Sequence, residues 1–184
     1  MDNLTNVQKV RKLGKPEFTA KYIRSIIDYQ HEAENGPMLS LVDRGNLSVG
    51  QQVGTITPNG YRQVFIKYWG FKASRLAYLM MTGDWPPAGM MMDHIDGDRA
   101  NDKWSNLRLA TPQQNARNRR PCKRNKSGKV GVCVGIDPDK WTAHITVNDK
   151  TTVLGSFECI DDAIAARCKA EKHLFGAFRR GVSK

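Results

Sequence analysis

The segment 90–115 constrains the fold of this chain most, because it carries in order the signals of a strand, a turn, a second strand and a helix. Its apolar start, 90–92, would be buried as a short strand and would deliver the dipeptide Asp93-His94 at its end. Asp96-Gly97 marks a tight turn, and the polar loop that follows leads into a second apolar stretch at 107–110. We therefore predict two short strands joined by a polar loop.

A helix is predicted directly after the second strand. Thr111 can cap it, Pro112 suits the first helical position, and Gln114 has the spacing from Thr111 that completes a capping box. Asn115 then lies in the first turn or so of this helix, where its side chain can reach the end of the first strand. Asn106 sits directly before the second strand. The pattern therefore predicts that polar residues distant in the sequence converge.

The side chains of this segment favour metal-assisted hydrolysis. A carboxylate oxygen from Asp93 and an amide oxygen from Asn115 are ligands that suit one hard divalent cation, Mg²⁺ or Mn²⁺. A neutral imidazole beside them, from His94, can activate a water molecule near neutral pH. The alternative is that the acid and the two asparagines are ordinary turn and cap residues and that the histidine is a polar surface residue. The joint spacing favours the catalytic interpretation.

The segment resembles the HNH nuclease family, whose ββα-metal motif has the same order of elements. By position, the resemblance implies that Asp93 and Asn115 are metal ligands and that His94 is the general base. It also implies that Asn106 is a structural residue that fixes the loop and orients the histidine. The context over 39–120 is similar to that of phage and intron-encoded homing members. The reaction implied is hydrolysis of a phosphodiester bond in DNA.

One metal ion and one general base can hydrolyse one phosphodiester bond at a time. We therefore expect a monomer that nicks one strand of double-stranded DNA. A double-strand break would need a dimer or two successive events.

The charge of the chain agrees with a polyanionic partner. Its 184 residues include 29 Lys and Arg against 18 Asp and Glu, which gives a net charge of +11. A membrane partner is not expected, because no stretch approaches the roughly 20 apolar residues that span a bilayer. The four cysteines form no Cys-x-x-Cys pair. We therefore expect a reduced, cytoplasmic protein without a Cys-based zinc site.

The residues before the central segment predict a helix, a small antiparallel sheet and a second helix. Apolar residues repeat at helical spacing over 18–29, with Thr19 as the N-cap. Three strand-like stretches follow, at 39–42, 52–56 and 61–66. A second helix is predicted over 74–83, with Ser74 as its cap and Gly83 as its stop.

A strongly basic stretch follows the central segment. Its cationic residues, with no acid among them, are Arg117, Arg119, Arg120, Lys123, Arg124, Lys126 and Lys129. Such a run is often only a solvated linker, yet its place between two predicted domains favours contact with DNA phosphates. The residues 125–128 add the flexibility of a tether.

Beyond this stretch the sequence predicts three short strands, at 130–134, 141–147 and 151–157. A helix follows over 163–174, which begins at Asp161 or Asp162 and is stopped by Gly176. The pattern resembles the AP2 DNA-binding domain over about 127–178, particularly at Trp141-Thr-Ala-His-Ile145 and Leu154-Gly155-Ser-Phe157. Such domains lay a sheet in the major groove and read bases from its outer face.

The residues expected to contact DNA in this part follow from strand alternation. Thr142, His144 and Thr146 share one face of the middle strand, and Thr151 lies on the neighbouring strand. Packing is the alternative role for the histidine. Three lysines are expected to contact phosphates instead of bases: Lys129, Lys140 and Lys150.

The predicted fold class is α+β, with an N-terminal helix and small antiparallel sheet, a ββα-metal motif, and a three-stranded antiparallel sheet with a helix. The expected divisions are an N-terminal helical segment at 1–36, an HNH nuclease domain at 37–120 with its motif at 90–120, a basic linker at 121–128, an AP2-like domain at 129–178 and a basic tail at 179–184.

The pairing of domains resembles homing endonucleases of phages and related mobile elements, which implies a phage-encoded enzyme expressed in a bacterial host. Two other classes stay open. A DNA-binding regulator without catalysis would keep the basic stretch and the C-terminal domain, but it has no need of Asp93, His94 and Asn115 together. A protein that only packages nucleic acid would show no metal dependence.

Overall fold

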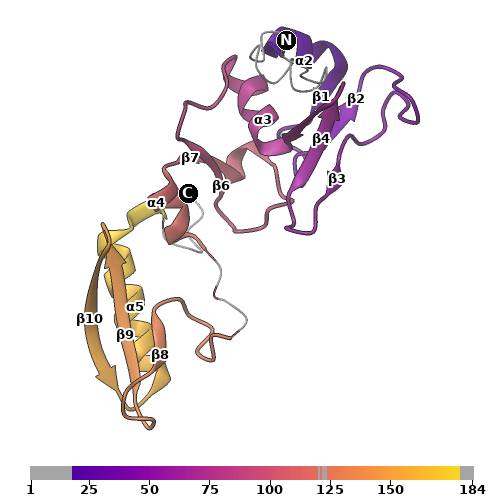
Figure 1. Ribbon diagram of the computed structural model, residues 1–184. Helices are drawn as coiled ribbons and strands as arrows, with labels where there is room; N and C mark the ends of the chain where they lie inside the picture. The colour runs from indigo at the N-terminus through magenta and orange to yellow at the C-terminus, as the bar shows by residue number, and fades with distance from the viewer. Residues whose placement is uncertain (1–17, 120, 122–123, 179–184) are drawn as a thin grey trace, which may run out of the picture. The chain divides into compact units, whose positions relative to one another are not determined.

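The computed structural model describes residues 18–119, 121 and 124–178. It combines helices with small antiparallel sheets, as the predicted α+β class requires (Figure 1). The chain divides into two compact units, one made of the residues up to His94 together with 98–109, the other of 95–97 together with the residues from Ala110 onward. Each unit is described by itself below. Within the described ranges, no helix has the length and apolar character needed to cross a membrane.

The first unit begins with helix α2, which is shorter than its sequence pattern predicts. The helix spans Ala20–Ile26, and the Thr19 side chain caps it by accepting a hydrogen bond from the backbone N–H of Tyr22. The prediction of helix up to Tyr29 was wrong, because Ile27–Tyr29 forms strand β1. That strand pairs antiparallel with β2, Met38–Ser40, and buries alternate residues. The alternation of burial in this pairing outweighs the apolar spacing that favoured a helix.

A second sheet lies between the two helices in the sequence. It consists of β3, Thr55–Ile56, β4, Arg62–Ile66, and β5, Trp69–Lys72, in antiparallel order. The strand β5 was not predicted. It runs directly into helix α3, Ala73–Thr82, and for this reason Lys72 occupies the N-cap position and Ser74 is buried inside the helix, not at its cap. Gly83 ends the helix in the left-handed conformation, with φ of 92°, as predicted.

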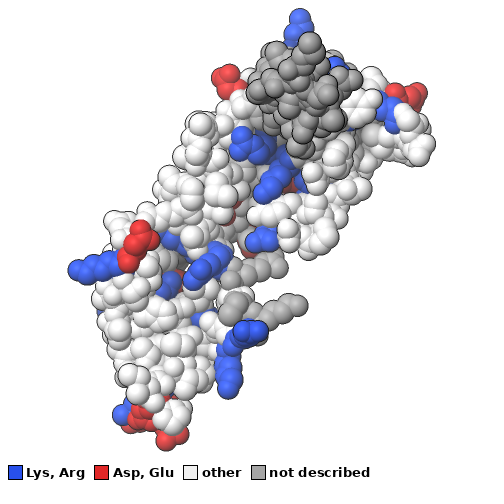
Figure 2. Space-filling view, in the orientation of Figure 1, with Lys and Arg blue, Asp and Glu red and all other residues white. Residues whose placement is uncertain are grey.

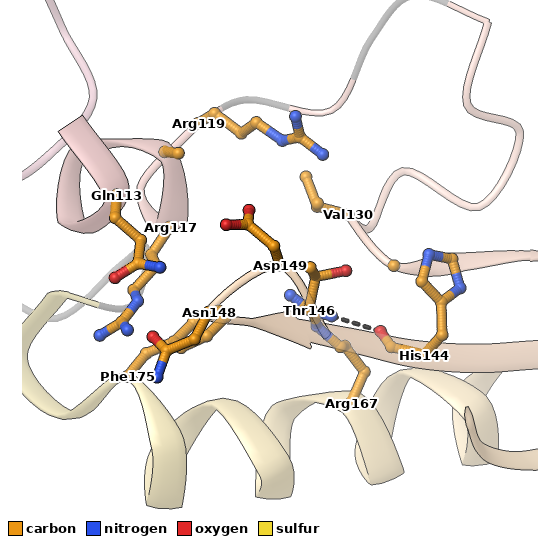
Figure 3. Close-up of a pocket in the computed structure, with 12 residues that line it drawn as sticks. Gln113, Arg117, Arg119, Val130, His144, Thr146, Asn148, Asp149, Arg167 and Phe175 are labelled. Atoms are coloured by element: carbon orange, nitrogen blue, oxygen red, sulfur yellow. Dashed lines mark hydrogen bonds between the residues drawn. The ribbon is translucent and has the colours of Figure 1, made fainter. Parts of the chain in front are cut away.

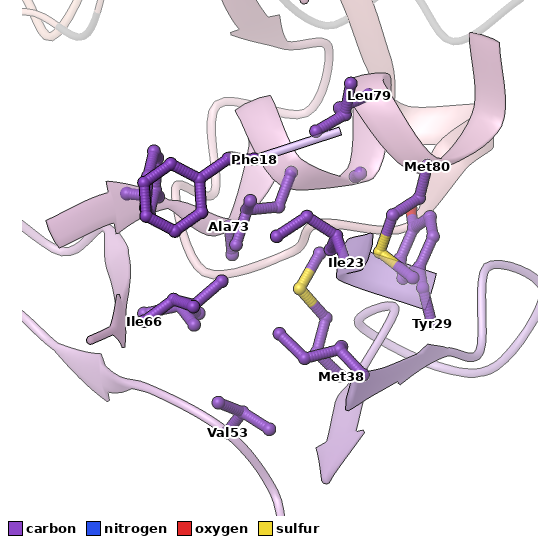
Figure 4. Close-up of a cluster of buried hydrophobic side chains, with 14 of the residues drawn as sticks. Phe18, Ile23, Tyr29, Met38, Val53, Ile66, Ala73, Leu79 and Met80 are labelled. Atoms are coloured by element: carbon purple, nitrogen blue, oxygen red, sulfur yellow. The ribbon is translucent and has the colours of Figure 1, made fainter. Parts of the chain in front are cut away.

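The core of the first unit joins both helices to both sheets (Figure 4). Ile23 of α2 and Leu79 of α3 are fully buried, and they share the cluster with Met38 of β2 and Ile66 of β4. Val53 is buried in the same cluster although it lies outside the strands, so the predicted strand over 52–56 contributes packing more than pairing. The short helices and strands of this unit therefore pack against one shared hydrophobic core.

The central segment has the predicted order of elements. Strand β6, Met91–His94, pairs with β7, Leu107–Ala110, and a 3₁₀ turn, η1, covers Trp104–Asn106 just before β7. Helix α4 then covers Pro112–Arg117. Its capping box is confirmed, because the Thr111 side chain accepts from the N–H of Gln114 and the Gln114 side chain accepts from the N–H of Thr111.

The second unit contains a three-stranded antiparallel sheet and a long helix. The strands are β8, Val132–Val134, β9, Trp141–Val147, and β10, Lys150–Phe157, in the order β10-β9-β8. Asn148 and Asp149, both at positive φ, form the turn between β9 and β10 that the sequence predicts. Helix α5 spans Ile160–Leu174, begins just before the two predicted aspartates, and is followed by a 3₁₀ turn, η2, at Gly176–Phe178.

Candidate active site

Strand β6 ends in two polar residues that are almost fully buried. Asp93 and His94 each expose 4% of their surface. Buried groups of this kind need polar partners, because leaving a charge unpaired inside a protein is costly. Asp93 and His94 each have a polar partner in the first unit, and the two partners are different residues.

His94 is held by an acid that the sequence analysis did not single out. Its Nε2 lies 3.1 Å from Oδ1 of Asp102, and both side chains are buried. The other carboxylate oxygen, Oδ2, lies 4.0 Å from Nε of Arg62 and makes no hydrogen bond within the described part of the chain. Burial raises the pKa of Asp102 above its usual value, and the hydrogen bond with His94 and the nearby charges of His94 and Arg62 act against this rise.

The backbone of Asp102 is fixed from the N-terminal side of the unit. Its N–H donates to the carbonyl of Asn35 at 3.1 Å, and its own carbonyl accepts from the hydroxyl of Tyr29 at 2.5 Å. Gly36 allows this approach, because a Cβ at that position would lie 2.6 Å from the backbone N of Lys103 and 2.7 Å from the carbonyl of Asp102. The loop that carries the acid is therefore anchored to residues far earlier in the sequence.

The acid was missed because it looks like its neighbours in the sequence. Asp96, Asp98 and Asp102 all lie in one polar loop, and only the last of them is buried. The contacts that bury it come from Tyr29, Asn35 and Arg62, and no local pattern reports contacts over such separations.

Asp93 is paired with Arg108 of the neighbouring strand β7. Nε of the guanidinium donates a hydrogen bond to the carboxylate oxygen Oδ2 at 2.8 Å, and Nη2 lies 2.7 Å from the same oxygen as part of the ion pair. Both side chains are largely buried, at 12% and 5% exposed. The positive charge of Arg108 therefore balances the buried carboxylate of Asp93.

The two asparagines lie on different elements. Asn106 is in the 3₁₀ turn before β7, and its side-chain Nδ2 donates to the carbonyl of Asn101 at 2.8 Å, which ties the turn to the loop. Asn115 lies on helix α4, in the second unit, where its N–H donates to the carbonyl of Thr111. Its role as a metal ligand stays a prediction.

The donor chemistry suits the predicted ion. No group of three or more His, Cys, Asp or Glu residues capable of holding a metal occurs in the described ranges. The predicted ligand set is different, since it consists of one carboxylate and one amide oxygen, and hard cations such as Mg²⁺ usually take few protein ligands and keep several waters. Asp93 fits such a role as a buried carboxylate whose charge Arg108 now balances.

We expect Arg108→Ala to destabilise the protein by about 3 kcal/mol, because it leaves a buried carboxylate without its partner. Adding Mn²⁺ should recover part of the loss by supplying the missing positive charge to Asp93. Thermal unfolding with and without Mn²⁺ measures this, and the variant should gain more than the wild type does. Arg62→Ala is the matched control, since it removes a cation from Asp102, which is not a predicted ligand. An equal gain in both variants would contradict the assignment of Asp93.

The outer face of the sheet in the second unit carries the residues predicted to read DNA. Ala143 and Ile145 of β9 are buried, and Ala143 packs with Ala163 of α5, so Thr142, His144 and Thr146 point away from the helix. In the register with β10, Thr146 faces Thr151, and their hydroxyls lie 2.8 Å apart.

The other face of this unit holds a buried ionic network. Arg167 of α5 pairs with Glu171 at 2.8 Å and also donates to the carbonyl of His144. Lys129, predicted to contact DNA phosphate, pairs with the same Glu171 at 2.7 Å. Burial, and then the charge of Arg167, lower the pKa of His144. The buried charges of α5 were not predicted from the sequence.

A pocket of about 320 Å³ opens beside this sheet (Figure 3). Figure 3 shows Thr146 and His144 from β9, Asn148 and Asp149 from the turn, and arginines from three segments around it: Arg117, Arg119 and Arg167. The guanidinium of Arg117 also lies 5.0 Å from the ring centre of Phe175. Several residues predicted to contact DNA thus lie around one hollow.

The remaining predicted contacts are at the surface or outside the described ranges. Arg119, Arg124, Lys126 and Lys150 are exposed, and Lys140 is an exposed partner of Asp137 at 3.6 Å. Figure 2 shows exposed Lys and Arg side chains on both units. The predictions for Arg120, Lys123 and the basic tail at 179–184 fall on residues outside those described.

Comparisons with known proteins show which family this segment resembles. The family model described as HNH endonuclease matches residues 71–117, which include β6, β7 and α4. Protein 3.8 of Escherichia phage T7 is 33% identical over 94 residues, which cover 51% of this chain and 77% of the relative. An uncharacterised HNH endonuclease of Acanthamoeba polyphaga mimivirus is 33% identical over 104 residues, which cover 56% of this chain and 53% of the relative. No solved structure matches the chain.

The fold is that of a small α+β protein with a buried, hydrogen-bonded histidine at the end of strand β6. The chain belongs to the HNH endonuclease family.

Proposed function

We propose that the protein is a site-directed DNA endonuclease of the homing type, which hydrolyses one phosphodiester bond with one divalent metal ion and nicks one strand. The observation that carries the proposal is the buried pair of His94 and Asp102 at the end of strand β6, within the segment that the HNH endonuclease model matches. A histidine in such a setting is poised for proton transfer, not for packing alone.

The proposed role of His94 is that of general base. In the proposed tautomer, Nε2 carries the proton and donates a hydrogen bond to the carboxylate of Asp102, which leaves the lone pair on Nδ1. The imidazole can then take a proton from the attacking water at Nδ1, and the acid stabilises the imidazolium that forms. Tyr61, whose ring centre lies 5.9 Å from that of the histidine, closes one side of the imidazole.

Asp93 and Asn115 are the proposed ligands of a Mg²⁺ or Mn²⁺ ion. When bound, the ion would supply Lewis-acid stabilisation of the negative charge that develops on the phosphate. Arg108 orients Asp93 through the hydrogen bond from Nε to Oδ2 and through the ion pair with the same oxygen. Asn106 holds the loop between the strands by its bond to Asn101, and so supports the position of the histidine.

The second unit is proposed to bring this chemistry to its target. Its three-stranded sheet with a helix on one face leaves the outer face of β9 exposed, with threonine hydroxyls that can contact base edges. The arginines around the pocket in Figure 3 can contact the phosphate backbone. The phage relative agrees with a proposed action inside an infected bacterial cell. An AP2-like role for residues 129–178 is part of this proposal.

The direct test is incubation of the purified protein with supercoiled plasmid and either Mg²⁺ or Mn²⁺. The expected product is the relaxed circle that a single nick gives, and none should form with a chelator. Mapping the nick on the genome that encodes the protein gives the target site. If the protein binds DNA tightly and leaves it intact with both metals, the non-catalytic regulator is the better description.

Replacing Asp102 by asparagine is expected to lower kcat by about 10- to 1,000-fold with little change in KM, because an amide holds the histidine in its tautomer less firmly. The control is Asp98→Asn, in the same loop, since this residue is exposed and its bond from the N–H of Ala100 can be kept by an amide. Nitrogen NMR of the imidazole reports the tautomer directly. An unchanged tautomer with unchanged kcat would remove Asp102 from the mechanism.

A further inference from the structure

Two cations lie over one aromatic ring next to His94. The ring of Tyr61 is 5.9 Å from the imidazole between ring centres, at an angle of 53°. The ammonium group of Lys72, at the end of β5, lies 3.9 Å from the centre of the Tyr61 ring. The guanidinium carbon of Arg99, in the loop after β6, lies 4.9 Å from the same centre. Segments far apart in the sequence thus place two positive charges close to the proposed general base.

Neither Lys72 nor Arg99 forms an ion pair with a carboxylate in the part of the chain that the structure describes. Arg99 donates one hydrogen bond, from Nη1 to the carbonyl of Asn59 at 2.9 Å. The π face of Tyr61 offsets only part of the cost of bringing two like charges together.

The neighbouring positive charges also affect the pKa of Lys72. Partial burial, followed by the charges of Arg99 and of Arg75 in helix α3, lowers the pKa of Lys72. Other cations of this unit are balanced differently, since Arg62 faces Asp102 and Arg108 faces Asp93. Among the described residues, no ion pair with a carboxylate balances this positive site beside the histidine, and a bound anion would relieve the repulsion there.

We propose that Lys72 and Arg99, arranged around Tyr61, form a binding site for a phosphate of the DNA backbone next to the phosphodiester bond that His94 serves. The proposal rests on the proposed nuclease function for the identity of the substrate. Lysine offers a point charge and arginine a planar fork of donors, and both recognise phosphate oxygens without reading the base sequence. The site would hold the strand in register with the histidine, while the second unit supplies the choice of sequence.

The test measures binding without catalysis. Affinity for a duplex oligonucleotide is measured without divalent metal over a series of salt concentrations, for the wild type and for the double variant Lys72→Gln, Arg99→Gln. Each lost phosphate contact should lower the magnitude of the slope of log K against log salt by about 0.9, so the double variant should lose about two. The control is Lys67→Gln, because this lysine also lies over a tyrosine, Tyr22, at 5.6 Å, on the same sheet.

A second variant separates charge from shape. Lys72→Arg combined with Arg99→Lys keeps both charges and should keep the slope of the wild type. An unchanged slope in the folded Gln double variant would overturn the proposal, and so would an equal loss in the charge-keeping variant or in Lys67→Gln. Because this test measures no cleavage, the two proposals can fail separately. If the wild type does not nick DNA but the Gln double variant shows the expected loss of slope, the nuclease function is contradicted and the phosphate site still stands.

Discussion

His94→Ala is expected to lower the rate of metal-dependent DNA cleavage by about two to four orders of magnitude, because it removes the proposed general base. DNA affinity should stay close to that of the wild type, since the basic residues of both units are untouched. The measurement is single-turnover nicking of supercoiled plasmid, with affinity taken from the same preparation in a chelator. Cleavage within tenfold of the wild type would show that another group takes the proton.

The variant also leaves Asp102 buried without its partner, which costs about 1–3 kcal/mol of stability. His94→Gln controls for this loss, because its amide can still donate to the carboxylate while it cannot act as a base at neutral pH. His31→Ala controls for the loss of a histidine in general, since His31 is exposed and lies in the same unit. Equal inactivity of both His94 variants, with an active His31 variant, assigns the effect to the chemistry.

Gly36→Ala is expected to destabilise the protein by about 2–4 kcal/mol, from strain at a positive φ and from overlap with backbone atoms. The φ of Gly36 is 55°, and a Cβ there would lie 2.6–2.7 Å from the backbone of Asp102 and Lys103. Urea unfolding measures the loss. The variant should also cleave DNA more slowly while folded, because the displaced loop carries the partner of His94.

The chain offers a matched control for this glycine. Gly45 has nearly the same φ, 57°, and a Cβ there would meet nothing within 4 Å. Gly45→Ala should therefore cost only about 1 kcal/mol, the price of the backbone conformation alone. A similar loss in the two variants would mean that the close approach to Asp102 contributes nothing to stability.

Local signals in the sequence predicted the elements that local rules control. The capping box of Thr111 and Gln114 and the stop at Gly83 are found as expected, because each depends on residues within one helical turn. The strand β9 has its predicted bounds, since alternation and a flanking turn define it. These features need no knowledge of the rest of the chain.

The errors fall where distant contacts decide the outcome. Ile27–Tyr29 is a strand because β2 pairs with it, although its spacing continues that of the helix before it. Ser74 is not a cap because β5 continues up to Lys72 and the helix starts at once. The pairing of Lys129 with the buried Glu171, 42 positions later, was also not predicted, and the contact of Lys129 with DNA phosphate stays a prediction.

The candidate site likewise contains residues that the sequence identified and partners that it could not identify. The sequence identified Asp93 and His94 at a strand end, and the structure has them there. It could not identify their partners, because Asp102 is one of several acids in its loop and Arg108 one of many cations in a basic chain. Residue type and spacing locate a reactive group, whereas its support depends on which neighbours the fold buries beside it.

The anchoring of Asp102 bears on how far the nuclease motif can be moved or trimmed. A fragment cut to residues 71–117 would keep His94 and Asp102 but would leave behind Tyr29, Asn35 and Arg62, which fix or face that acid. On another scaffold, this fragment would still contain His94 and Asp102. Asp102 would lack the contacts that hold it in place, so it could not orient the histidine. The smallest transferable module is therefore the whole first unit together with helix α4, which carries the proposed ligand Asn115. Exchange of such motifs between proteins should succeed only where Tyr29 and Asn35 travel with them.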